Sequence, residues 1–111
     1  MKIKDIVPLL EAEVLCGEED LDQDVRTACG SDMMSDVLAF VKDQSALLTG
    51  LVNPQVIRTV LMMDIICVIF VRGKKPTEEM IELAAKSGIV LLSTPMRMYE
   101  ACGKLYSKLN A

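Results

Sequence analysis

The chain has 111 residues, of which 51% are hydrophobic and 25% charged, and its formal net charge is −4. This length and balance predict one folded domain spanning residues 1–111 and exclude a disordered chain. The acidic charge argues against nucleic-acid binding, and no segment approaches the ~18 apolar residues of a membrane span. The mean hydropathy of +0.34 is high for a small domain and hints at a homodimer that buries spare apolar surface.

The chain begins with Met1–Asp5, which alternates in polarity and lacks the apolar core of a signal peptide, so we expect a cytoplasmic protein. There is no histidine and no C-x-x-C pair, and the cysteines lie far apart at Cys16, Cys29, Cys67 and Cys102. Metal sites usually show paired ligands, so we predict reduced thiols, no metal and no cofactor. The missing histidine also removes any Ser-His or Cys-His dyad.

Hydrophobic spacing in the first part of the chain predicts a helix over 2–10, strands over 12–17 and 25–29, and a helix over 33–42. Ser31-Asp32 supplies an N-cap for the second helix. Glu18–Asp24 is an acidic connector between the two strands. It is typical of a solvated turn, and as a calcium loop it lacks the central glycine and terminal glutamate of an EF-hand.

A run of seven apolar residues, Ile65–Val71, has no polar face and predicts a strand covered on both sides. Strands over 45–51 and 89–92 flank it in the sequence. Asn53-Pro54 begins a helix over 54–63, Pro76-Thr77 begins one over 76–86, and Ser93-Thr94-Pro95 caps a last helix over 96–109.

This alternation predicts a three-layer α/β fold with a mainly parallel sheet of about four to five strands flanked by helices. The turns that follow parallel strands gather at the carboxyl edge of the sheet, where open α/β folds bind ligands. Helix N-termini, glycines and hydroxyls at one edge favour an anion. The residues we predict at this site are Thr49, Gly50, Asn53, Arg72, Gly73, Lys74, Ser93 and Thr94.

The basic turn Arg72-Gly73-Lys74-Lys75 has two interpretations. Gly73 could let the backbone approach a phosphate that Arg72 and Lys74 bind, or the turn is only a solvated connection. Capping by itself explains Asn53 and either Ser93 or Thr94. The P-loop spacing is absent, and an enzyme in which Asp32 acts as base lacks a visible nucleophile, so we predict a protein that is not an enzyme.

Eight methionines indicate either core filling or an adaptable contact surface. Tyr99 and Tyr106 lie seven residues apart on the last predicted helix and therefore share a face. That face packs either on the sheet or on a partner.

Two segments, L-L-T-G-L-V-N-P-Q-V-I-R-T-V and D-I-I-C-V-I-F-V-R-G-K-K-P-T-E-E-M-I-E-L-A-A-K-S-G-I-V-L-L-S-T-P-M-R-M-Y-E-A-C-G-K-L, resemble the DRTGG domain. The upstream C-G-S-D-M-M-S-D-V-L-A resembles its first part, so the likeness covers about Val14 to Leu109. The family's Asp-Arg pair is replaced here by Leu51-Val52. Its Thr-Gly-Gly is replaced by Val71-Arg72-Gly73 or Arg72-Gly73-Lys74, which keeps one glycine.

The DRTGG domain is related to the amino-terminal domain of HPr kinase/phosphorylase and occurs between CBS domains in regulated pyrophosphatases. The resemblance implies an α/β fold, a regulatory rather than catalytic role and frequent dimerisation. We therefore predict a homodimeric regulatory or interaction module that senses an adenine nucleotide or another phosphorylated small molecule. The alternative is an accessory subunit that docks on a redox or kinase complex, because small members of this kind are often encoded near hydrogenase-like or NADH-dehydrogenase-like subunits.

Overall fold

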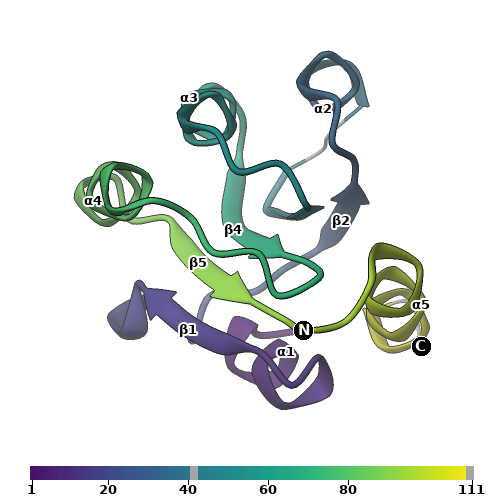
Figure 1. Ribbon diagram of the computed structural model, residues 1–111. Coiled ribbons are helices and arrows are strands. Elements are labelled where there is room, and N and C mark those ends of the chain that lie inside the picture. The colour runs from purple at the N-terminus through teal and green to yellow at the C-terminus, as the bar shows by residue number, and fades with distance from the viewer. Residues whose placement is uncertain (41–42, 110–111) are drawn as a thin grey trace.

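The computed structural model describes residues 1–40 and 43–109, in which helices and strands alternate along most of the chain (Figure 1). The helices are α1 (Ile3–Leu9), the 3₁₀ turn η1 (Glu18–Asp20), α2 (Met34–Phe40), α3 (Pro54–Met62), α4 (Glu78–Lys86) and α5 (Met98–Leu109). The strands are β1 (Glu13–Cys16), β2 (Thr27–Gly30), β3 (Ser45–Thr49), β4 (Ile65–Phe70) and β5 (Val90–Ser93).

The strands form one five-stranded sheet in the order β1-β5-β4-β3-β2. The last four strands along the chain are parallel and β1 is antiparallel to β5, so the predicted α/β fold with a mainly parallel sheet is confirmed. Because β1 is antiparallel, its carboxyl end lies at the edge where the parallel strands begin. The connection to β2 therefore crosses the sheet at that edge without a crossover helix.

Helices cover both faces of the sheet, with α2, α3 and α4 on one face and α1 and α5 on the other (Figure 1). Side chains of β4 alternate between the two cores. Cys67 and Ile69 pack toward α1 and α5, and Val68 and Phe70 pack toward α2–α4. All four are 0% exposed, so β4 is the central, doubly covered strand that its apolar run predicts.

Several predicted boundaries differ from the structure by one or two residues, and side chains that redirect the backbone account for two of them. Strand β3 ends at Thr49, two residues early, where the Leu51 N–H turns back to the Thr49 hydroxyl. The last helix begins at Met98 rather than Met96, since the Met96 N–H bonds to the Thr94 hydroxyl in a local turn. Strand β2 begins at Thr27. The predicted helix end at Lys42 lies outside the described residues.

Large apolar side chains remain at the surface in several places. Tyr99 is 93% exposed and Tyr106 68% exposed, so their shared face does not pack on the sheet. The methionines divide between the two predicted roles: Met34, Met80 and Met96 fill the core, whereas Met33 and Met62 are 61% and 73% exposed. All four cysteines are free. The described residues contain no helix long and apolar enough to cross a membrane and no cluster of metal-ligating side chains.

Candidate functional site

The connections that follow the parallel strands meet at the carboxyl edge of the sheet, as the alternation of strands and helices predicts. Backbone hydrogen bonds join them in series: Ser31 N to Leu48 O at 3.0 Å, Val71 N to Thr49 O at 3.0 Å and Gly73 N to Thr94 O at 2.8 Å. Each bond joins the end of one strand to the turn beside it. The edge is therefore a fixed surface rather than a set of independent loops.

Asp32 holds the end of β3 in place. Its Oδ1 accepts the Thr49 hydroxyl at 3.0 Å and the Gly50 N–H at 2.7 Å. Thr49 is fully buried, and its hydroxyl in turn accepts the Leu51 N–H at 3.2 Å. The predicted site residues Thr49 and Gly50 thus share a carboxylate that the sequence suggested only as a cap or a weak catalytic base.

Arg72 extends across this cluster. A Cβ added at Gly50 would overlap the Arg72 guanidinium, so the glycine provides the space in which the cation lies against the backbone. Arg72 has a left-handed backbone with φ of 57°, which costs a residue other than glycine roughly 1–2 kcal/mol. Residues other than glycine keep this conformation only where surrounding contacts hold them, and such residues cluster at functional sites.

The contacts that hold the basic turn use its backbone N–H groups. Arg72 N donates to Met96 O at 2.7 Å, Gly73 N to Thr94 O and Lys74 N to Val71 O at 3.1 Å. These N–H groups are therefore already engaged and do not face solvent as an anion cradle. What the turn presents outward is the exposed side chains of Arg72 and Lys74, while the Lys75 ammonium pairs with Glu13.

The hydroxyls of two predicted site residues make structural hydrogen bonds to backbone carbonyls. Ser93 is 3% exposed and donates to the Lys74 carbonyl at 2.8 Å, which fixes the basic turn against β5. Thr94 is 0% exposed and donates to the Leu10 carbonyl at 2.5 Å, which ties the edge to the end of α1. Neither hydroxyl faces solvent.

Asn53 caps α3, as the sequence predicts, by accepting the Gln55 N–H at 2.8 Å. The structure therefore joins Thr49 and Gly50 through Asp32 and places the Arg72 guanidinium against Gly50. Lys74 lies on the same turn as Arg72, whereas Ser93, Thr94 and Asn53 are engaged in structural hydrogen bonds. Their involvement with ligand remains a prediction.

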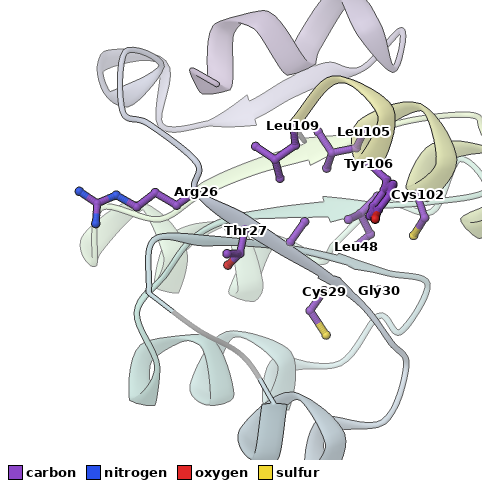
Figure 2. A pocket seen from close by; sticks show the side chains of 10 residues that line it. Arg26, Thr27, Cys29, Gly30, Leu48, Cys102, Leu105, Tyr106 and Leu109 are labelled. Atoms are coloured by element: carbon purple, nitrogen blue, oxygen red, sulfur yellow. The ribbon is translucent and has the colours of Figure 1, made fainter. Parts of the chain in front are cut away.

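A groove that the sequence did not predict lies away from the basic turn. It is a groove of about 330 Å³ between the edge strand β2 and α5, shown in Figure 2. Its lining residues are Arg26, Thr27, Ala28, Cys29, Gly30, Leu48, Cys102, Leu105, Tyr106 and Leu109. The shared face of Tyr99 and Tyr106 was the signal in the sequence that pointed to this side of α5.

Cys29 and Cys102 are the chemically distinctive members of this groove. Burial raises the pKa of each thiol above its ordinary value, and a nearby carboxylate adds to the shift for Cys29. A raised pKa lowers the fraction of thiolate, which is the reactive form. The groove therefore has the chemistry of a contact surface and lacks an activated nucleophile.

The fold has a counterpart among solved structures. The chain resembles the crystal structure of the CBS and DRTGG domains of the regulatory region of Clostridium perfringens pyrophosphatase, complexed with its activator diadenosine tetraphosphate. The TM-score is 0.74 at 20% identity, and the likeness covers 94% of this chain but 45% of the other. No curated protein matches the chain. The sequence pattern of the DRTGG domain matches residues 5–107, so the chain belongs to the DRTGG domain family, as its resemblance indicates.

Proposed function

We propose that this protein is a regulatory module without catalytic activity, and that it binds a phosphorylated small molecule at the carboxyl edge of its sheet. The observation that carries the proposal is the Arg72 guanidinium, which lies across Gly50 with no ion pair to any residue in the described ranges. A guanidinium on a rigid turn suits bidentate contact with phosphate. Lys74 supplies a second cation two residues away.

The chemistry of the remaining edge supports binding rather than catalysis. Asp32 already accepts two hydrogen bonds through one oxygen, which suits a structural role. Burial raises the pKa of every cysteine thiol in the chain. The hydroxyl–carboxylate pair of Thr49 and Asp32 is within hydrogen-bond reach at 3.0 Å, but Thr49 is 0% exposed, so its hydroxyl is not accessible to a substrate.

An adenine nucleotide is the ligand class that we propose. Two cations on one turn match a di- or triphosphate better than a single phosphate, since each can engage a separate group. The similar pyrophosphatase region was crystallised with an adenine-containing polyphosphate, which supports testing that class first. The apolar side chains of Leu51 and Val52, both partly exposed beside Gly50, offer a surface for a base.

We further propose that the module is a cytoplasmic homodimer. The exposed tyrosines and methionines provide apolar surface for a protein contact, and four free cysteines suit a reducing compartment. An accessory subunit of a redox or kinase complex would use the same apolar surface, and its docking would not require a nucleotide.

Isothermal titration with ATP, AMP and inorganic phosphate tests the ligand site. We expect ATP to bind most tightly, and Arg72→Asn to weaken binding at least about ten-fold while its backbone keeps the left-handed conformation that asparagine tolerates. Lys74→Ala should weaken ATP more than AMP. The control Arg58→Asn removes the same charge from the exposed face of α3 and should leave binding unchanged. Absence of binding at millimolar ATP, or equal affinity of all variants, would refute the site.

A further inference from the structure

Two opposite charges at the carboxyl edge of the sheet adjoin the same glycine. Asp32 Oδ1 accepts the Gly50 N–H at 2.7 Å, and the Arg72 guanidinium fills the space that a Cβ at Gly50 would occupy. Because both groups touch substituents of one Cα, the carboxylate and the guanidinium lie within about 8 Å of each other. Asp32 and Arg72 are both exposed, so a ligand in solvent can reach them.

These two charges do not neutralise each other. Neither Asp32 nor Arg72 belongs to an ion pair in the part of the chain that the structure describes. Two hydrogen bonds occupy Oδ1 of Asp32, whereas no hydrogen bond from a described residue reaches Oδ2. Lys75, a neighbouring cation on the basic turn, is paired with Glu13. The edge therefore presents an unpaired carboxylate beside an unpaired guanidinium.

A free nucleotide matches only half of this arrangement. Its phosphates can pair with Arg72 and with Lys74 on the same turn, but the Asp32 carboxylate beside Gly50 repels their negative charge. Like charges this close lower the affinity unless a cation lies between them. Since no described lysine or arginine pairs with Asp32, the protein does not supply that cation.

Magnesium is the cation that suits a single carboxylate. Proteins bind Mg²⁺ through one or two carboxylates together with phosphate oxygens of the substrate, and the ion keeps several waters. Mg–O contacts are roughly 2.0–2.1 Å and charge-assisted N–H···O contacts roughly 2.7–2.9 Å, so carboxylate, magnesium, phosphate and guanidinium in sequence span a gap of this size. The described residues offer no cluster of metal ligands, so the ion is held only while phosphate is bound.

We propose that the ligand of this edge is the magnesium complex of a nucleoside di- or triphosphate, with Asp32 Oδ2 as the protein's ligand to the metal. The inference rests on the proposed nucleotide site and names the form in which the nucleotide binds. It gives one carboxylate two roles: Oδ1 fixes the end of β3, and Oδ2 contacts the ion. Arg72 and Lys74 pair with the phosphate oxygens that the metal leaves free.

Isothermal titration of the full chain with ATP, in excess Mg²⁺ and in EDTA at equal ionic strength, tests the proposal. We expect Mg²⁺ to lower the dissociation constant of ATP from wild type at least about ten-fold. Mg²⁺ without nucleotide should bind too weakly to measure, because one carboxylate provides too few ligands. AMP should respond to magnesium less than ATP does, since a single phosphate chelates the ion less well.

Asp32→Asn isolates the charge of the carboxylate. Its amide oxygen can still accept the Thr49 hydroxyl and the Gly50 N–H, while an NH₂ group replaces the ligand to the metal. The effect of magnesium on ATP affinity should fall below about two-fold, and ATP in EDTA should bind at least as tightly as to wild type because the repulsion is gone. The matched control Asp64→Asn lies at the opposite edge of the sheet, where its carboxylate also accepts a backbone N–H, and should keep the full effect.

Manganese supplies a readout that needs no variant. Mn²⁺ replaces Mg²⁺ in nucleotide complexes and broadens the amide resonances of residues near it. With ATP and trace Mn²⁺, the broadening should be strongest at Asp32 and Gly50 and weakest at Asp64, which precedes β4 at the far edge. Without ATP this selective pattern should disappear, since the ion is then not retained.

The outcomes separate the inference from the function on which it rests. Failure of ATP to bind with or without metal refutes both. Equal affinity for ATP in EDTA and in Mg²⁺ refutes the magnesium complex and leaves the nucleotide site standing. A magnesium effect that survives in Asp32→Asn, shown to be folded by circular dichroism, refutes the role of Asp32. If that variant does not fold, manganese broadening centred away from Asp32 and Gly50 in wild type refutes the same role.

Discussion

Thr94→Val distinguishes a structural role of the predicted site residues from direct ligand binding. Valine keeps the shape of threonine but removes the hydroxyl, which donates to Leu10 O at 2.5 Å and accepts the Met96 N–H at 3.2 Å. The site is 0% exposed, so water cannot replace either partner. Each lost hydrogen bond costs about 1 kcal/mol, and an unpaired buried carbonyl adds to this, which gives about 2–3 kcal/mol in total.

The expected change in melting temperature follows from the size of the chain. Unfolding entropy near ~2.1 cal/mol/K per residue gives about 230 cal/mol/K for 111 residues. A loss of about 2–3 kcal/mol therefore lowers the melting temperature by about 9–13 °C. Differential scanning calorimetry measures the shift directly. The control Ser107→Ala removes an exposed hydroxyl that donates to Lys104 O and should change stability by less than about 0.5 kcal/mol.

Nucleotide titration of the same variant supplies the second readout. Since the Thr94 hydroxyl faces Leu10 rather than solvent, Thr94→Val should bind ATP as wild type does at temperatures where it is folded. A melting temperature within about 2 °C of wild type would show that the buried bonds contribute little. Loss of ATP binding without loss of stability would instead place the hydroxyl in the ligand site, and would refute the structural role.

The remaining predictions concern three glycines and one thiol. Gly17→Ala should destabilise the protein by about 2–4 kcal/mol in urea unfolding, because Gly17 has φ of 86° and its Cβ would lie 2.9 Å from Val90 Cα. Gly88→Ala shares the positive φ but meets nothing within 4 Å, so it should cost only about 1–2 kcal/mol; equal losses would contradict the steric argument. Gly103→Ala, in α5 with open space around it, should stabilise by about 0.5–1 kcal/mol, and a loss would indicate a contact at this position. Cys67 is fully buried with a raised pKa, so mass spectrometry after iodoacetamide treatment should find it unmodified until the protein unfolds; labelling of the native protein would refute its burial.

The architecture can be predicted from the sequence because the signals that specify it are local. A seven-residue apolar run specifies the central strand β4, and Asn53-Pro54 specifies the start of α3 through contacts within two residues. Alternating strands and helices then leave a parallel sheet as the arrangement that buries every apolar face. The gathering of Thr49, Gly50 and Arg72 at one edge follows from that alternation.

The role of each residue at that edge depends instead on contacts between distant parts of the chain. The partner of the Thr94 hydroxyl is Leu10, 84 residues away, and the carboxylate that binds Thr49 comes from Asp32, 17 residues away. Such partners depend on the order of strands in the sheet, which local patterns do not encode. The same holds for the position of β2 at an open edge and for the groove beside it. These features arise because small residues of β2 and exposed residues of α5, distant in sequence, are brought together by packing.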